Sequence, residues 1–290
     1  MAAHVSLVIP ARNEGPLLPA TVASIARART DLPYDVVVVD DGSAPAAWQP
    51  PRPHPGLALT VVRTAGEGAA GARNRGASRT QSEWVCFCDA HVGVADGWLD
   101  GMVEALRQTG AAAVAPALAR AGDPAARGYG YTWTARGEAR WLPRPPGGPA
   151  PVPFLPGGCT LMHRSAFAAV GGYDAGLVPW GHEDTEISLA LWLTGHDAVV
   201  APEVVVEHRF RTRHPYLVRQ DQVDSNLARV GWIHFSPTRA ARFARAAGVS
   251  AQLAAVAASP TAQRRRARLL AARRRTDDWF CETFGLRHWD

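Results

Sequence analysis

The 290-residue sequence predicts an α/β fold in which a mostly parallel central sheet carries helices on both faces, followed by a helical C-terminal extension. Three observations predict it. Short, fully apolar segments typical of buried strands alternate with helix-like segments through the first 115 residues. Several of these apolar segments end in acidic residues or histidine, as strands do at the ligand-binding edge of an open α/β sheet. Beyond Tyr216 the pattern is helical to the end of the chain.

The individual elements follow from apolar runs and from the residues that interrupt them. Residues 5–9 form a buried strand stopped by Pro10, and residues 13–16 open a helix that continues to residue 28. By the same reasoning we expect strands at 35–39, 57–62, 84–89, 111–115 and 198–206, and helices at 71–79, 98–108, 164–170 and 184–195. Residues 140–156 are crowded with Pro and Gly and should form a long loop. We therefore expect a catalytic domain over residues 1–212 and a helical extension over residues 213–290.

Composition limits the classes of function. The net charge is +5 and the chain contains no lysine, so every cationic side chain apart from histidine is an arginine, which suits bidentate phosphate contacts. This mild basicity permits an anionic substrate without indicating a nucleic-acid partner. The four cysteines lack a CxxC pair, which indicates a reduced, cytoplasmic setting. Met1 is followed almost at once by the first strand, and no apolar run approaches the ~20 residues of a membrane span, so we expect neither a signal peptide nor an anchor.

The run Trp84 to His91 (WVCFCDAH) ends a buried strand in an acid and an imidazole separated by one residue. A carboxylate and an imidazole can together hold a borderline cation such as Mn²⁺ or Zn²⁺. The alternative is that Asp89 only caps the following turn. His208, at the end of a later strand, would complete a set of two histidines and one carboxylate, with Arg211 available to bind phosphate.

Three other segments have both a structural and a functional interpretation. Asp40 and Asp41 end the valine strand, where one can cap the turn and the other can accept a hydrogen bond from a nucleoside. The acids after Trp180 (WGHED) either suit a helix N-terminus or form an acceptor pocket. Residues 66–71 match GxGxxG, but two strand units precede them and the next helix is rich in arginine, which argues against a dehydrogenase.

Together these segments resemble a known family. Residues 5–13 (VSLVIPARN), 36–43 (VVVVDDGS) and 72–76 (ARNRG), with the Asp-Ala-His and Glu-Asp motifs, resemble family 2 glycosyltransferases of the GT-A fold. Residues 88–106, 156–188 and 208–211 are especially similar to the catalytic domain of polypeptide N-acetylgalactosaminyltransferases. The resemblance covers roughly residues 4–212 and depends on the motifs jointly.

The resemblance implies a role for each motif. Residues that would line uracil and ribose are Pro10, Ala11, Arg12, Asn13 and Asp41, with Arg73 closing over the base. Asp89, His91 and His208 would hold Mn²⁺ (or Mg²⁺) against the diphosphate, which Arg211 would help to neutralise. Those that would surround the transferred sugar and the acceptor are Gly157, Gly158, Trp180, Glu183 and Asp184.

One departure bears on the stereochemistry of transfer. The polypeptide N-acetylgalactosaminyltransferases, which retain anomeric configuration, usually carry Glu-Asn where this chain has Glu183-Asp184, and Glu-Asp resembles inverting relatives in which the Asp is the base. We therefore expect a metal-dependent enzyme that moves a hexose or N-acetylhexosamine from a UDP-sugar to a peptide, glycan or small-molecule acceptor. Asp184 would be the base and Glu183 a sugar or acceptor ligand.

Other functions remain as alternatives. They are a retaining peptide O-glycosyltransferase and a non-catalytic nucleotide-binding protein. A sugar nucleotidyltransferase would need an N-terminal Gly-rich loop and a following lysine, which this chain lacks.

The C-terminal extension carries two arginine clusters, residues 264–268 and 273–275. We expect a solvated helix face, with contact to an anionic membrane surface or to an acidic acceptor as the less favoured alternative. The aromatic residues Trp279, Phe280, Phe284 and Trp289 should pack the extension onto the catalytic domain.

Overall fold

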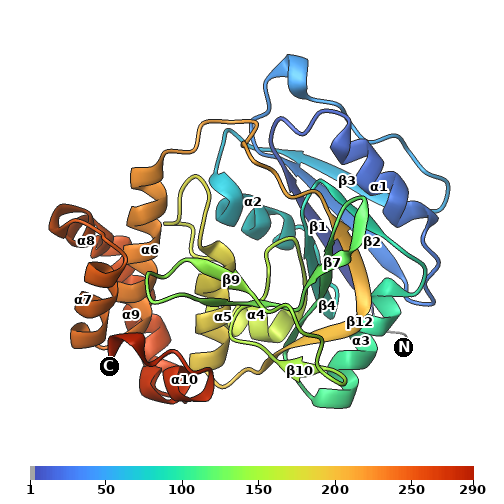
Figure 1. Cartoon of the computed structure of the whole chain (residues 1–290). Coiled ribbons are helices and arrows are strands. Elements are labelled where there is room, and N and C mark those ends of the chain that lie inside the picture. The colour runs from blue at the N-terminus through green and yellow to red at the C-terminus, as the bar shows by residue number, and fades with distance from the viewer. Residues whose placement is uncertain (1–3) are drawn as a thin grey trace.

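The computed structural model describes residues 4–290 and is built around a ten-stranded sheet (Figure 1). The strands of this sheet are β1 (Val5–Ala11), β2 (Tyr34–Asp40), β3 (Ala58–Arg63), β4 (Trp84–Cys88), β5 (Val92–Val94), β6 (Ala113–Arg120), β7 (Asp123–Gly128), β10 (Ala150–Pro151), β11 (Cys159–His163) and β12 (Ala198–His208). A separate hairpin consists of β8 (Tyr131–Trp133) and β9 (Ala139–Trp141). The main path through the sheet runs in the order β10-β12-β6-β11-β4-β1-β2-β3.

Helices occupy most of the positions expected from the apolar patterns. Those of the N-terminal part are α1 (Leu17–Arg27), α2 (Gly68–Ala77), α3 (Trp98–Thr109), α4 (Arg164–Val170) and α5 (Glu183–Leu193). The C-terminal part consists of α6 (Gln220–His234), α7 (Pro237–Ala246), α8 (Ala251–Ala257), α9 (Pro260–Ala271) and α10 (Asp277–Thr283). Two short 3₁₀ turns lie at Pro45–Ala47 and Arg287–Trp289. None of the helices within residues 4–290 has the length and apolar character needed to span a bilayer.

The sheet is more mixed than expected. The parallel pairs are β1 with β2 and β4, β2 with β3, and β6 with β12, as the strand–helix alternation predicts. Strand β11, however, lies antiparallel between β4 and β6. No helix connects β6 to β11: the chain between them forms β7, which pairs with β6, then the hairpin β8–β9, and then β10, which pairs with β12. A strand that returns without a crossover must run in the opposite direction.

Helices cover both faces of the sheet, each over its own hydrophobic core. On one face, α1 and α3 pack through Leu18, Val22, Trp98 and Met102 against the odd-numbered residues of β1. On the other face lie α2, α4 and α5. The side chains of β1 alternate between the two cores, which is the period of a buried strand. The predicted α/β class with helices on both faces is therefore confirmed.

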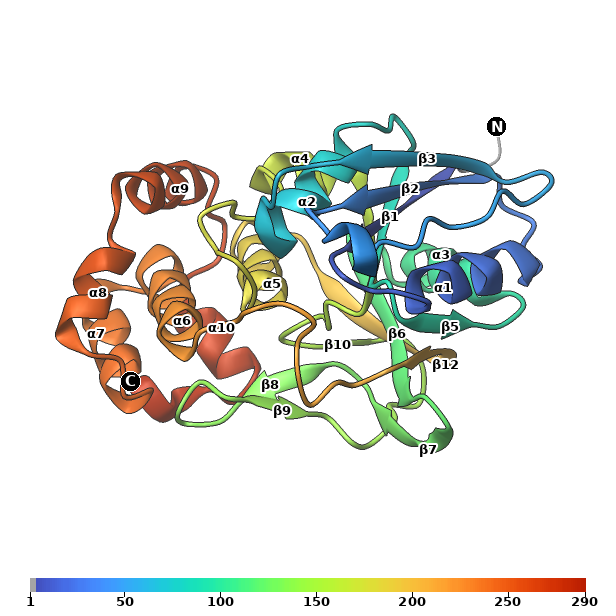
Figure 2. The same cartoon turned by 90° about the horizontal axis from the view of Figure 1, so that it is seen from above.

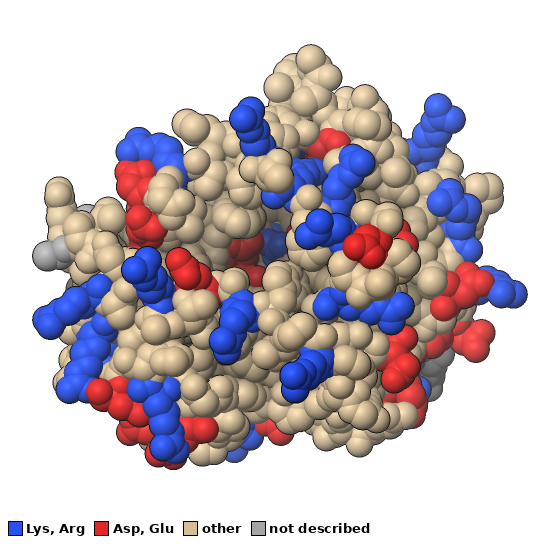
Figure 3. All heavy atoms as spheres, viewed as in Figure 1, with Lys and Arg blue, Asp and Glu red and all other residues tan. Residues whose placement is uncertain are grey.

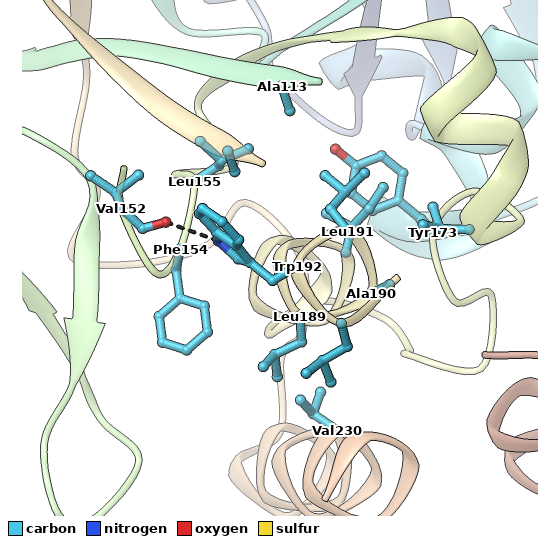
Figure 4. Packing of buried hydrophobic residues seen from close by; sticks show 14 of the residues in the cluster. Ala113, Val152, Phe154, Leu155, Tyr173, Leu189, Ala190, Leu191, Trp192 and Val230 are labelled. Carbon is cyan, nitrogen blue, oxygen red and sulfur yellow. Dashed lines mark hydrogen bonds between the residues drawn. The ribbon is translucent and has the colours of Figure 1, made fainter. Parts of the chain in front are cut away.

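Helix α5 explains why the C-terminal helices are needed. Residues Ile187 to Leu193 are all buried, so this helix has no solvent-facing side. Figure 4 shows its side chains pointing in several directions, with Trp192 donating a hydrogen bond to the carbonyl of Val152 at 3.0 Å. Helices α6 to α10 form an outer layer beyond α5 (Figure 2), and α6, α7, α9 and α10 contribute buried residues to the same core. The division at residue 212 stays a prediction.

Several arginines of the extension face the catalytic domain, which corrects the expectation of a solvated helix face. Arg265 forms an ion pair with the fully buried Glu186 of α5 at 2.7 Å, and the same carboxylate binds His234 at 2.9 Å. Arg275 pairs with Asp197 of the catalytic domain, whereas Arg273 donates to the carbonyl of His234 within the extension itself. The expected packing of Phe280 and Trp289 into the core is confirmed, as is that of Trp279 and Phe284 against it. The guanidinium groups of these arginines are bound to carboxylates and carbonyls of the protein itself. They therefore do not form a free membrane-binding face.

Replacing Arg265 by alanine is expected to lower the free energy of unfolding by about 3–5 kcal/mol, because it leaves the Glu186 carboxylate buried without its main partner. Arg264→Ala, on the exposed side of the same helix, is the matched control and should change stability by less than about 0.5 kcal/mol. Urea unfolding followed by circular dichroism measures both. Equal stability of the two variants would show that Arg265 does not anchor the extension.

Candidate active site

Two adjoining cavities open at the carboxyl ends of the central strands. Figure 3 shows this face hollowed near its middle, with acidic and basic atoms inside the hollow. The first cavity has a volume of about 320 Å³ and the second about 370 Å³. They share the residues Arg73, Asp89, Trp180, His208 and Phe210. The site is therefore a single cleft with two compartments, placed where open α/β sheets bind ligands.

Asp89, His91 and His208 meet at the boundary between the compartments. Asp89 directly follows β4 and His208 ends β12, and the two strands lie apart in the chain but in the same sheet. Nε2 of His208 lies 3.2 Å from Oδ2 of Asp89, and Nε2 of His91 lies 3.8 Å from the same oxygen. One donor atom from each residue lies within 4.8 Å of the other two. One carboxylate oxygen and two imidazole nitrogens at this spacing fit a borderline divalent cation, with room in the cavity for further ligands.

Gly158 permits the approach of His208 to this position. A Cβ atom on residue 158 would lie 2.8 Å from Cδ2 of the His208 ring, closer than packing allows. Gly158 is thus required for space, in agreement with its expected place at the site. Residues 157 and 158 line the second cavity.

Arg73, which was expected to close over the base, lines both cavities and is bound by groups of the protein itself. Its buried guanidinium donates to Asp89 at 3.0 Å, to Glu183 at 3.0 Å and to the carbonyl of Gly157 at 3.2 Å. It therefore holds the expected metal-binding acid and the start of α5 in fixed positions. Burial by itself would raise the pKa of Asp89, but the hydrogen bond from His208 and the charge of Arg73 hold it well below its ordinary value. Asp89 is consequently ionised, as a metal ligand must be.

Arg211 lies at the first cavity but is held by an acid that the sequence did not single out. It forms a two-bonded ion pair with Glu14, through Nη1 at 3.0 Å and through Nη2. Oε2 of Glu14 also lies 3.3 Å from Nδ1 of His91. Glu14 therefore links the phosphate-binding candidate to the metal-binding candidate, the kind of outer contact that fixes the orientation of an imidazole.

Both acids at the end of β2 are engaged by the protein itself. Asp40 accepts from the backbone of Ser43 at 2.9 Å, which is the expected turn cap. Asp41 lines the first cavity, but its carboxylate accepts from Thr64, from the backbone of Glu67 at 2.6 Å and from that of Gly68 at 2.9 Å. Asp41 thus fixes the start of α2. If it also binds a ribose, it does so while keeping these hydrogen bonds to the protein.

The glycine-rich run at residues 66–71 allows the start of α2 to pack closely against the loop that contains Pro179. A Cβ atom on Gly68 would lie 2.8 Å from the carbonyl oxygen of Pro179, and the backbone of Ala69 donates to that carbonyl at 2.9 Å. The run therefore brings the loop before Trp180 against α2, which agrees with the rejection of a dehydrogenase fingerprint.

Asn13 is the one expected nucleotide-binding residue that does not line either cavity. Its side chain donates to the carbonyl of Pro215 at 3.0 Å and accepts from the backbone of Ala44 at 2.8 Å. It ties down the loop after β12, which places Tyr216 beside Arg12, with 5.3 Å between the Arg12 guanidinium carbon and the ring centre. Pro10, Ala11 and Arg12 do line the first cavity.

The second cavity contains the two acids at the start of α5. The Glu183 carboxylate is taken up by Arg73 and by the backbone of Gly181 at 2.8 Å. Asp184 accepts from the backbone of Gly157 at 3.2 Å and from that of Thr185 at 2.8 Å. Burial and, next, the charge of Glu183 raise the pKa of Asp184 to about 6. Asp184 can therefore exchange its proton close to neutral pH.

Aromatic side chains that the sequence did not single out form the walls of the second cavity. They are Tyr131, Trp133, Trp141 and Phe210, in addition to the expected Trp180. Trp141 and Phe210 pack edge to face with their ring centres 5.6 Å apart. The only sequence feature that could have identified Trp141 is its position in the Pro/Gly-rich segment, whose long-loop pattern already suggested a functional role.

Known proteins match this chain in sequence and in fold. Residues 6–171 match the family model described as glycosyl transferase family 2, and residues 144–215 match one described as N-terminal domain of galactosyltransferase. Putative polypeptide N-acetylgalactosaminyltransferase 13 of Drosophila melanogaster is 30% identical over 244 residues, covering 74% of this chain and 43% of the relative. Human polypeptide N-acetylgalactosaminyltransferase 16 is 28% identical over 238 residues, covering 73% and 41%.

Solved structures share the fold. A crystal structure of GalNAc-T7 with UDP, GalNAc and Mn²⁺ superposes with a TM-score of 0.79 at 22% identity, covering 98% of this chain and 57% of that one. The mannosyltransferase PcManGT of Pyrobaculum calidifontis, in complex with GDP-Man and Mn²⁺, superposes with a TM-score of 0.58 at 21% identity, covering 94% and 86%. The expected GT-A architecture is thereby confirmed.

The predicted resemblance to polypeptide N-acetylgalactosaminyltransferases is also confirmed, although the chain spans less than half the length of these curated relatives. The family 2 model covers more than half of the 290 residues and includes the strand ends that carry Asp41 and Asp89. The chain belongs to glycosyl transferase family 2.

Proposed function

We propose that this protein is a metal-dependent glycosyltransferase that moves a hexose or N-acetylhexosamine from a UDP-sugar to an acceptor nucleophile. The observation that carries the proposal is the meeting of Asp89, His91 and His208 at the boundary of two compartments. A donor bound there would place its nucleotide in the first compartment and its sugar toward the second. The names of the relatives, which are N-acetylgalactosaminyltransferases, support an N-acetylhexosamine.

The donor set fits Mn²⁺ or Mg²⁺, with Asp89, His91 and His208 as the protein ligands. The cation, when bound, would neutralise charge that develops on the departing diphosphate. One fold relative was solved with UDP, GalNAc and Mn²⁺ and another in complex with GDP-Man and Mn²⁺, which supports the same cofactor here.

The chain's own residues position the donor around this centre. Arg211, fixed by Glu14, presents a guanidinium to the first compartment, where it can bind a phosphate oxygen. Arg73 fixes Asp89 and Glu183 relative to each other. Trp180 is 38% exposed beside both compartments and offers an apolar ring face to a sugar.

We further propose inversion, with Asp184 as the general base. Its carboxylate faces the second compartment, and a pKa of about 6 allows it to accept a proton from an acceptor hydroxyl at neutral pH. The similarity to polypeptide N-acetylgalactosaminyltransferases favours the alternative, a retaining transfer to a peptide hydroxyl. The anomer of the product separates the two, because inversion of an α-linked donor gives a β-linkage. A cytoplasmic location stays a prediction.

A donor screen tests the proposal. The full-length protein is incubated with Mn²⁺ and, separately, with UDP-glucose, UDP-galactose and their N-acetyl forms, and release of UDP is followed. One donor should be hydrolysed slowly even without an acceptor, and a chelator should stop the release. Binding of UDP that is indifferent to Mn²⁺, together with no hydrolysis of any donor, would favour a non-catalytic nucleotide-binding protein.

A further inference from the structure

Three of the four cysteines form a cluster directly behind the proposed metal site. Sγ of Cys88 lies 3.7 Å from Sγ of Cys86 and 3.7 Å from Sγ of Cys159. All three side chains are fully buried, and the three sulfurs lie within 4.8 Å of one another. The fourth cysteine, Cys281, belongs to α10 and to the other hydrophobic core. Nothing in the proposed transfer reaction uses these thiols.

The register of the strands makes one pair of thiols suitable for a covalent link. Cys88 and Cys159 stand opposite each other in the antiparallel pair β4–β11. The next backbone hydrogen bond runs from the amide of Asp89 to the carbonyl of Gly158 at 3.0 Å, so Cys88 and Cys159 are a non-hydrogen-bonded pair. The Cα atoms of such a pair lie about 4.5 Å apart, within the range of about 4.4–6.8 Å found in disulfides. The two thiols can therefore be joined without separating the strands.

Cys86 is less well placed for the same reaction. It precedes Cys88 by two residues on the same strand, and residues so spaced are about 6.6 Å apart along an extended backbone. That separation is near the upper limit for a disulfide. The cross-strand pair is therefore the favoured one.

The apolar surroundings of the three cysteines favour an uncharged disulfide over a metal ion bound by their thiolates. The three thiols share their core with Leu7, Ile9 and Leu161, and all of these side chains are fully buried. Three thiolates around a divalent cation would carry a net negative charge into this apolar core, which is costly without a partner. A disulfide is uncharged and leaves Cys86 as a thiol.

We propose that Cys88 and Cys159 form a reversible disulfide that weakens cation binding at Asp89 and His208. A hydroperoxide is the oxidant: one thiol gives a sulfenic acid and the reduced alcohol or water, and the second thiol displaces water to form the S–S bond. A dithiol reductant restores both thiols by exchange. The effect on the cation rests on the proposed function of the site.

The disulfide would affect cation binding because both cysteines are next in sequence to residues that position the metal ligands. Cys88 directly precedes Asp89, and Cys159 directly follows Gly158, on which a Cβ atom would lie 2.8 Å from Cδ2 of the His208 ring. Disulfide formation must bring the two sulfurs from 3.7 Å to about 2.05 Å. This movement acts on the two residues that position the Asp89 carboxylate and the His208 imidazole. Because contacts that orient metal ligands typically change affinity by 10–100-fold, we expect Mn²⁺ binding to weaken by about tenfold.

The test treats the purified full-length protein with hydrogen peroxide and maps disulfides by mass spectrometry of unreduced peptides. Mn²⁺ binding is measured by calorimetry before oxidation, after oxidation and after dithiothreitol. The wild-type protein should show a Cys88–Cys159 link and weaker binding that dithiothreitol restores. Cys159→Ala should keep its Mn²⁺ affinity under peroxide. Cys281→Ala is the matched control and should respond as the wild type does.

Absence of the Cys88–Cys159 link, or a Cys86–Cys88 link in its place, would overturn the assignment. So would a link that leaves Mn²⁺ binding unchanged. The mapping is made on wild-type protein and does not depend on any variant folding. If the reduced protein fails to bind Mn²⁺ at all, the proposed function of the site fails, while the peptide map still decides whether the disulfide forms.

Discussion

Asp184→Asn is expected to reduce the rate of sugar transfer by about 10²–10⁴-fold, the usual contribution of a general base, while UDP binding stays within about twofold of the wild type. The asparagine amide cannot accept a proton at neutral pH. Its oxygen can still accept the hydrogen bond from the backbone of Thr185, whereas the hydrogen bond from the backbone of Gly157 to the second carboxylate oxygen is lost. Asp184 does not line the first compartment, where the nucleotide is proposed to bind, so that compartment is unchanged. Transfer rates under saturating donor, with UDP affinity from calorimetry, separate the two effects.

The pH profile provides a control for this result. Burial and the charge of Glu183 raise the pKa of Asp184 to about 6, so the carboxyl group is protonated below that pH and cannot act as a base. The wild-type rate should therefore rise as the pH increases from ~5 to ~7 and then level off. The asparagine variant should lose this rise. A variant that retains full transfer activity would remove the inverting proposal.

His208→Ala is expected to weaken Mn²⁺ binding by more than about 100-fold, because it removes a direct ligand and even outer contacts cost 10–100-fold. Mn²⁺-dependent UDP release should fall in parallel. His196→Ala is the matched control, since this histidine follows α5 and lines neither cavity.

The space left beside Gly158 could lower stability, so thermal unfolding is measured for both variants. A His208→Ala protein that binds Mn²⁺ as the wild type does would exclude this histidine from the metal site.

The N-terminal fold was predictable because its elements carry their own patterns. Strands β1, β2 and β4 are mostly apolar, with an uninterrupted run of four valines in β2, and α3 has a clear apolar face ended by Gly110. By contrast, β9 is three exposed residues and β7 is exposed in five of six positions, so neither has the alternation that marks a strand. The antiparallel entry of β11 depends on the path of these segments and could not be read locally.

The site was predictable where a motif supplies the chemistry and unpredictable where distant residues share it. The Asp89–His91 spacing and His208 at a strand end identified the cluster that the structure brings together. The partners of Arg73 include Glu183, 110 residues away, and the partner of Asn13 is Pro215, 202 residues away. Neither pairing has a sequence pattern, so the sequence predicted only nucleotide contacts for these two side chains and did not reveal that they also connect distant parts of the protein.

The central claim is most directly tested by the position of the cation. A crystal of the full-length protein grown with UDP and Mn²⁺ should give an anomalous scattering peak within coordinating distance of Asp89, His91 and His208, with diphosphate oxygens completing the coordination. A peak that contacts none of these three residues, or UDP bound in the first compartment without any metal peak, would contradict the account.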